Sequence, residues 1–110
     1  NVQDNYTIMK EEPFGPLVPI LSFKKFDEVI ERANNNDLGL CSYICTNSME
    51  QAHRASELME SGTVAVNTPV VAIAEAPFGG IKQTGYGREG GSMAIKDYLN
   101  VKYTHLGIKG

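Results

Sequence analysis

Two short segments rich in glycine, proline and charged residues constrain this chain more than any other feature. The first is Glu11-Glu12-Pro13-Phe14-Gly15-Pro16, and the second spans residues 77–89 with the sequence PFGGIKQTGYGRE. Proline fixes one backbone angle and glycine allows angles that other residues avoid, so both segments are predicted to form tight, irregular loops. An ordinary solvent-facing loop does not need a phenylalanine beside its glycines. Both segments are therefore candidates for functional loops.

Local patterns outside these segments predict three helices. Apolar residues recur at helical spacing over residues 26–34, and Ser48 with Gln51 has the capping-box pattern of a second helix that runs to about Glu60. Gly62 suits the C-terminal cap of that second helix. A third helix is predicted over residues 89–99, with its apolar side chains buried, namely Ile95, Tyr98 and Leu99.

Short apolar runs predict strands between these helices. They cover residues 17–23, 40–46, 63–67 and 101–108, and Pro19 makes the first of them an edge or irregular strand. Residues 68–87 have no periodicity and are predicted to form a long loop of the kind that usually carries function. This order of elements predicts an α/β fold with a mostly parallel sheet and flanking helices.

Composition excludes two classes of partner. The chain of 110 residues has a net charge of −3, and its longest basic cluster is the pair Lys24-Lys25, so a nucleic-acid-binding face is not expected. No apolar run approaches the roughly 18 residues of a membrane span, so no membrane association is expected.

The two cysteines, Cys41 and Cys45, are predicted to be thiols buried in the core. In an extended strand they share a face but lie too far apart for a disulfide, which favours a reducing, cytoplasmic location over a redox or metal pair. His53 and His105 have no second ligand at metal-binding spacing, so no metal site is expected.

Glu12 and Phe14 have two interpretations. The adjacent carboxylates of Glu11 and Glu12 can simply be solvated at a loop. A carboxylate can also accept two hydrogen bonds from a ribose diol, and a nearby aromatic ring can border a nicotinamide. Residues two apart in an extended backbone point to the same side, which would place Glu12 and Phe14 together.

The stretch Gly85–Gly90 matches the G-x-G-x-x-G pattern of dinucleotide-binding folds. No strand is expected directly before it and no compact βαβ unit surrounds it, so the match is weak. The favoured interpretation is that these glycines permit tight turns. A nucleotide-binding role for Gly85–Gly90 remains an alternative that requires cofactor binding by the chain itself.

In this order and at this separation, the two loop segments resemble the C-terminal part of the NAD(P)-dependent aldehyde dehydrogenases. The resemblance extends over nearly the whole chain and includes Arg32-Ala33-Asn34-Asn35 and the run Tyr98-Leu99-Asn100-Val101-Lys102. It implies that residues 1–100 form the C-terminal part of a catalytic domain and that residues 101–110 form an oligomerisation strand that joins other copies of the chain.

The resemblance also implies a division of roles. Glu12 would bind the nicotinamide ribose of NAD or NADP, Phe14 would border the nicotinamide ring, and Ile73 and Phe78 would line the pocket of the aldehyde substrate. The family oxidises aldehydes through a cysteine thioester. Its nucleophile, general base and nucleotide-binding fold precede the first loop segment, so no catalytic residue is expected here and the isolated chain is expected to be inactive.

The substrate branch and the role of the chain are less constrained. The resemblance is greatest to the branch that oxidises carboxylated semialdehydes such as succinate semialdehyde, on the run Gly87-Arg88-Glu89-Gly90 followed by Asp97-Tyr98-Leu99 and Lys102-Tyr103. However, Val70-Val71-Ala72-Ile73-Ala74 is apolar where that branch often carries a polar residue, so an aldehyde with an apolar tail is an alternative. A stand-alone, non-catalytic assembly module is the alternative from a different functional class.

Overall fold

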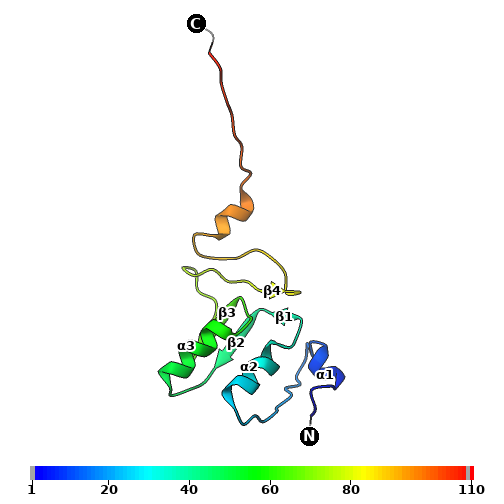
Figure 1. Ribbon diagram of the computed structural model, residues 1–110. Helices are drawn as coiled ribbons and strands as arrows, with labels where there is room; N and C mark the ends of the chain where they lie inside the picture. The colour runs from blue at the N-terminus through cyan, green and yellow to red at the C-terminus, as the bar shows by residue number, and fades with distance from the viewer. Residues whose placement is uncertain (1, 109) are drawn as a thin grey trace.

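The computed structural model describes residues 2–108 and residue 110. Figure 1 shows a small mixed α/β body from which the C-terminal residues extend as a single strand-like trace. The helices and strands follow in the order α1 (Thr7–Lys10), α2 (Phe26–Asn34), β1 (Leu38–Gly39), β2 (Cys41–Ile44), α3 (Met49–Leu58), β3 (Thr63–Val66), β4 (Ile81–Lys82) and the 3-10 helix η1 (Ala94–Tyr98).

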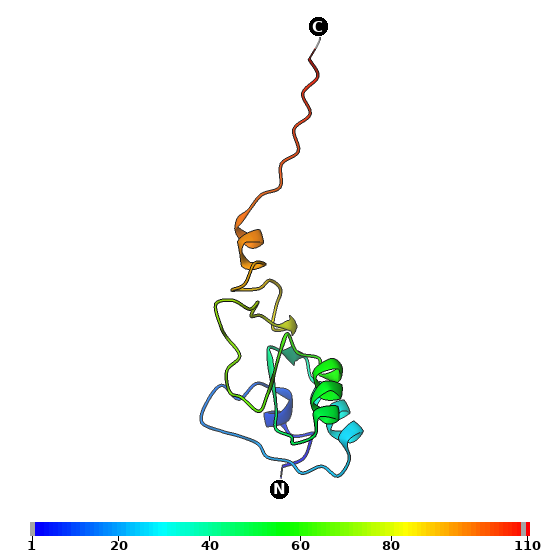
Figure 2. The same cartoon turned by 90° about the vertical axis from the view of Figure 1, so that its left-hand side faces the viewer.

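The helices predicted around residues 26–34 and 49–60 are confirmed as α2 and α3, and they lie together beside the β2–β3 pair (Figure 2). Arg54 of α3 joins them, because its guanidinium lies 4.6 Å from the ring centroid of Phe26 and 2.9 Å from Oδ1 of Asp27. A cation over an aromatic face and an ion pair both favour this packing.

The single, mostly parallel sheet predicted from the sequence is replaced by two small sheets. β2 and β3 pair in parallel from Cys41↔Thr63 to Ile44↔Val66, with α3 as the crossover that a parallel pair requires. β1 and β4 pair antiparallel, with Leu38 opposite Lys82. The short β4 lies inside the region 68–87 that was predicted to be all loop.

Ser48 begins α3 as predicted. Its Oγ accepts a hydrogen bond from the backbone N–H of Gln51 at 3.3 Å. The side chain of Gln51 is connected to the backbone N–H of Ser48 through Thr46. The Ser48 N–H donates to Oγ1 of Thr46, and that hydroxyl donates to Oε1 of Gln51.

The prediction that Gly62 caps α3 is wrong. The helix ends at Leu58, and Met59 already has an extended backbone with φ −71° and ψ 123°. Gly62 lies where the chain passes Gly79, and a Cβ at Gly62 would overlap the carbonyl of Gly79. Glycine is required by this close approach, which brings the start of β3 against the second loop segment.

Two further predictions differ from the structure. Residues 17–23 form no strand. Residues 7–10, which lie outside the predicted elements, form the short helix α1. The third helix shrinks to η1, and its apolar side chains Ile95, Tyr98 and Leu99 are exposed, not buried. A helix gains little from an apolar face when no neighbouring element of the described chain covers it.

The described chain buries very little. Ala55 at 2% exposure and Ala65 at 5% are its only fully buried apolar residues. Many large apolar side chains between Tyr6 and Ile108 are exposed. The radius of gyration is 19.6 Å, against roughly 13 Å for a compact domain of this length. So much exposed apolar surface marks regions suited to contact with other protein.

In the described residues, no helix has the length and apolarity needed to cross a membrane.

Candidate functional site

The first loop segment follows α1 directly. The Glu11 N–H donates to the carbonyl of Thr7 at 2.8 Å and closes the helix. Two successive tight turns then run through the segment: the Phe14 N–H donates to the Glu12 carbonyl at 2.9 Å and the Gly15 N–H to the Pro13 carbonyl at 2.7 Å. The segment is thus the tight loop that was predicted, and not the extended backbone that would place Glu12 and Phe14 on the same side.

Both proposed cofactor residues are open to solvent. Phe14 is 97% exposed and Glu12 is exposed as well. An exposed phenylalanine held in a tight turn gains nothing from burial within the described chain. The pair is therefore available to contact a ligand or another protein segment.

The second loop segment is closed upon itself. Phe78 and Glu89 exchange two backbone hydrogen bonds of 2.7 Å, and Arg88 donates from Nη1 to the carbonyls of Gly80 at 2.8 Å and Gly87 at 2.6 Å. Gly85 and Gly87 have φ angles of 110° and 91°, which other residues rarely adopt. The prediction that these glycines serve tight turns is confirmed.

Both loop segments border one hollow beside β1. Glu12, Gln83 and Thr84 line one hollow of about 480 Å³ together with residues of β1 and β2. Phe78 lines a neighbouring hollow of about 620 Å³ with Arg88, Asp97 and Tyr98, and Leu40 and Thr84 border both. Ile73 lies in the loop before Phe78 and is 51% exposed.

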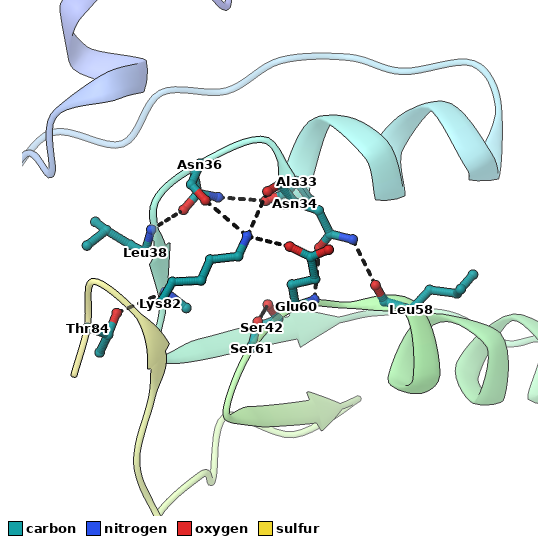
Figure 3. Close-up of polar contacts among 11 residues, drawn as sticks. Ala33, Asn34, Asn36, Leu38, Ser42, Leu58, Glu60, Ser61, Lys82 and Thr84 are labelled. Atoms are coloured by element: carbon teal, nitrogen blue, oxygen red, sulfur yellow. Dashed lines mark hydrogen bonds and ion pairs between the residues drawn. The ribbon is translucent and has the colours of Figure 1, made fainter. Parts of the chain in front are cut away.

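Lys82 fastens the second segment to the body, as Figure 3 shows. Its Nζ donates to the carbonyls of Asn34 at 2.8 Å and Asn36 at 3.0 Å and lies 2.6 Å from Oε2 of Glu60. Lys82 has a φ of 56°, an uncommon angle for a residue with a Cβ. Three acceptors for one ammonium group offset the cost of this backbone conformation.

Asn34 connects the hydrogen bonds of Lys82 with the C-terminal end of α3. Its side-chain Nδ2 donates to the carbonyl of Leu58 at 2.8 Å, and its Oδ1 accepts from the backbone N–H of Glu60 at 2.9 Å. The ends of both helices are thus held with Lys82 (Figure 3). Sequence reasoning missed this cluster. The run of three asparagines that begins at the last residue of α2 was the available signal, because helix ends leave carbonyl groups that need donors.

Asn67 precedes the predicted pocket residues Ile73 and Phe78, and its side-chain amide binds the backbone of Thr46. Its Oδ1 accepts from the backbone N–H of Thr46 at 3.0 Å, and its Nδ2 donates to the carbonyl of Thr46 at 2.8 Å. With φ at 55°, Asn67 turns the chain at the end of β3. Its side chain extends the β2–β3 ladder by one pair of hydrogen bonds.

The cysteines are not both buried, which corrects the prediction. Cys41 is half-buried in β2 and Cys45 is exposed just after it, and both are free. Neither thiol makes a hydrogen bond with a histidine or carboxylate among the residues described. Residues 2–108 and 110 contain no group of three metal-ligating side chains close enough to hold an ion.

Comparison with known proteins identifies the family. The family model described as "Aldehyde dehydrogenase family" matches residues 1–104. The chain is 44% identical over 107 residues to the mitochondrial succinate-semialdehyde dehydrogenase of Arabidopsis thaliana, covering 97% of this chain and 20% of the relative. It is 48% identical over 102 residues to human retinal dehydrogenase 2, covering 93% of this chain and 20% of the relative.

A solved structure extends the similarity to the fold. The NAD⁺ complex of an aldehyde dehydrogenase from Bacillus cereus matches with a TM-score of 0.91 and 45% identity, over 99% of this chain and 22% of that one. The chain therefore spans about a fifth of the length of the relatives that it matches. By sequence and by fold, this chain belongs to the aldehyde dehydrogenase family.

Proposed function

We propose that this chain acts as part of a longer NAD(P)-dependent enzyme that oxidises an aldehyde to the carboxylic acid. The exposed pair Glu12 and Phe14 is the observation that carries the proposal. Their neighbouring positions in one tight turn supply an acceptor and an aromatic face from the same loop. The family match over residues 1–104 supports assigning them to the nicotinamide half of the cofactor.

The chemistry of these two residues fits that half of the cofactor. A carboxylate at Glu12 accepts hydrogen bonds from both hydroxyls of a ribose, and the ring of Phe14 offers an apolar face to a nicotinamide. The cofactor, when bound, supplies a hydride acceptor. Glu12 would hold the ribose and Phe14 would limit the positions open to the ring, so both act by orientation.

The nucleophile of the proposed reaction lies outside this chain. A cysteine thioester requires a thiolate activated by a base, whereas Cys41 and Cys45 are free thiols that make no hydrogen bond to a base among the described residues. We propose that water hydrolyses the thioester and releases the acid. The free thiols are consistent with a cytoplasmic or other reducing compartment.

Ile73 and Phe78 are proposed to line the aldehyde pocket. The stretch Val70–Ala74 contains no polar side chain, and Val70 and Ile73 expose more than half of their surface. An apolar wall suits an aldehyde with an apolar tail, while the resemblance favours a carboxylated semialdehyde. Relatives that act on either kind of substrate match at similar identity.

Glu12→Gln in the enzyme that carries this chain tests the cofactor assignment. The amide accepts more weakly than the carboxylate, so hydride transfer is expected to slow about 10-fold or more. The measurement is the pre-steady-state rate of NADH or NADPH formation. Glu11→Gln is the matched control, since it removes the adjacent charge. An unchanged rate for Glu12→Gln would refute the role of Glu12.

Ile73→Ser tests the pocket assignment. A hydroxyl that reaches a distal carboxylate contributes about 1 kcal/mol, so the ratio of kcat/KM for succinate semialdehyde over a linear alkyl aldehyde should rise about five-fold. Ile95→Ser is the control, because Ile95 has a similar exposure of 59% but lies in η1. If both variants leave the ratio unchanged, Ile73 does not face that end of the substrate.

We propose that residues 101–110 join a neighbouring copy of the chain. The described part of this tail is extended and carries exposed apolar side chains at Val101, Tyr103, Leu106 and Ile108. The hydroxyl of Tyr103 lies 3.0 Å from Nδ1 of His105, as expected for residues on one face of an extended backbone. Strand addition to another copy would pair its backbone groups.

A stand-alone assembly module is the second candidate, because so many large apolar side chains are exposed. The flanking coding sequence separates the two candidates. A longer enzyme predicts an adjoining cysteine-containing catalytic segment and a nucleotide-binding domain, whereas the module predicts neither.

A further inference from the structure

One arginine joins the segment that carries Glu12 and Phe14 to the rest of the molecule. Arg32 lies on α2, and its guanidinium binds the Asp4 carboxylate at two points: Nε to Oδ2 at 3.1 Å and Nη2 to Oδ1 at 2.9 Å. Its third nitrogen, Nη1, donates to the carbonyl of Ser22 at 3.0 Å and to Oε1 of Glu28 at 3.5 Å. The hydrogen bond with Asp4 is the main reason that the pKa of Arg32 is raised.

These contacts hold both ends of one stretch of chain. Asp4 precedes Glu12 and Ser22 follows it, so the guanidinium closes residues 4–22 into a loop against α2. Within the described residues, every hydrogen bond that connects residues 2–22 with the remainder of the chain is donated by Arg32.

Local hydrogen bonds hold the residues between Asp4 and Glu12 to one another, so a shift at Asp4 is transmitted to Glu12. The Tyr6 N–H donates to the Gln3 carbonyl at 3.0 Å, α1 follows, and the Glu11 N–H closes that helix on Thr7. The Phe14 N–H then donates to the Glu12 carbonyl. A shift of Asp4 away from α2 would therefore move α1 and Glu12 with it.

Glu12 and Arg32 also border the same hollow. It has a volume of about 320 Å³ and is lined by Pro13 of the first loop segment, by Pro19 and by Ala33 near the end of α2. The large apolar side chains Phe14, Leu17 and Ile20 of the stretch 4–22 are exposed, so these three side chains do not hold the stretch against the rest of the molecule.

We propose that Arg32 is a positioning residue that sets the location of Glu12 through its paired contacts with Asp4 and Ser22. The inference rests on the proposed role of Glu12 toward the nicotinamide ribose. A planar guanidinium can bind a carboxylate at two points and still reach a carbonyl, whereas the single ammonium of lysine cannot reproduce that geometry.

Loss of the Arg32–Asp4 pair is expected to change the position of Glu12 more than the stability of the folded chain. The side chains of Arg32 and Asp4 are 29% and 61% exposed, and ion pairs with this much solvent contribute little to the free energy of unfolding. Small displacements of a group that orients a reactant still reduce rate strongly. Variants at this pair should therefore fold and melt nearly as the parent enzyme does.

The test is a double-mutant cycle between Arg32 and Glu12 in the enzyme that carries this chain. Arg32→Met should slow pre-steady-state NAD(P)H formation about 10-fold, and Arg32→Lys should rescue only part of that loss. The KM for the cofactor should rise and the KM for the aldehyde should not. Asp4→Asn, which changes an exposed residue, should reproduce part of the effect without Arg32 being altered.

The double variant Arg32→Met with Glu12→Gln decides between direct positioning and general damage. If Arg32 acts through Glu12, the double variant should be no more than about two-fold slower than Glu12→Gln alone, because residues that act as one unit are not additive. Arg54→Met is the control: Arg54 of α3 bonds Asp27 of α2 at 2.9 Å and makes no hydrogen bond with residues 2–22 in the described chain.

Three results separate this inference from the proposed function. Non-additive losses support both. The inference is overturned, and the role of Glu12 stands, if Glu12→Gln slows hydride transfer while Arg32→Met has no effect or only the effect of Arg54→Met. The same conclusion follows if the rate losses of Arg32→Met and Glu12→Gln multiply in the double variant. If Glu12→Gln leaves the rate unchanged, the proposed function fails and the inference fails with it.

Discussion

The isolated 110-residue chain is expected to produce no NADH or NADPH from any aldehyde above the rate of a heat-denatured control. Thioester chemistry needs an activated thiolate, and among the described residues neither Cys41 nor Cys45 makes a hydrogen bond to a base. Among the described residues only two apolar side chains are fully buried, so little of the structure is shielded from water. The loss relative to the longer enzyme should be complete.

The measurement is NAD(P)H absorbance with succinate semialdehyde, retinal and a linear alkyl aldehyde as substrates. The enzyme that carries this chain serves as the positive control at the same molar concentration. Turnover by the isolated chain that disappears in Cys41→Ser or Cys45→Ser would overturn the expectation and assign the nucleophile to this chain.

Removal of residues 101–110 is expected to reduce the assembly of the longer enzyme to a smaller oligomer. A strand that leaves its backbone donors and acceptors and its apolar side chains in solvent gains strongly from a partner. In Figure 1 this tail extends far from the body, so no described element of the same chain can pair with it. Sedimentation velocity in the micromolar range measures the change.

Paired substitutions separate backbone pairing from side-chain packing. Thr104→Pro with His105→Pro removes two successive N–H groups, one of which must face the partner strand, and should reproduce the deletion. Thr104→Ala with His105→Ala keeps both N–H groups and should retain the assembly. An unchanged sedimentation coefficient after the deletion would count against strand addition.

Local sequence signals predicted the elements that depend on local interactions. The apolar spacing in α2 and the hydroxyl of Ser48 before α3 act within a few residues, so both helices appear where they were expected. The strand predictions for β2 and β3 also held, because β-branched and aromatic residues are concentrated in both. The two loop segments carried enough information for the family to be recognised.

Local signals failed where an element lacked a partner. The apolar residues of the predicted helix 89–99 suggested burial, but the described chain supplies no surface to cover them, and only η1 forms. The positive φ angles of Gly90 and Gly91 further separate residue 89 from η1. Residues 101–108 remain extended and unpaired among the described elements, so their assignment as an oligomerisation strand stays a prediction.

The sequence by itself determined the family, the main helices, the parallel strand pair and the identity of the candidate residues Glu12, Phe14, Ile73 and Phe78. The tertiary structure decided how the loops are held: Lys82 reaches back to Asn34 and Asn36, and Arg32 binds both Asp4 and Ser22. These contacts join residues far apart in the chain, so they depend on loop closure and packing together. No short-range pattern encodes them, because each partner taken alone is an ordinary polar residue.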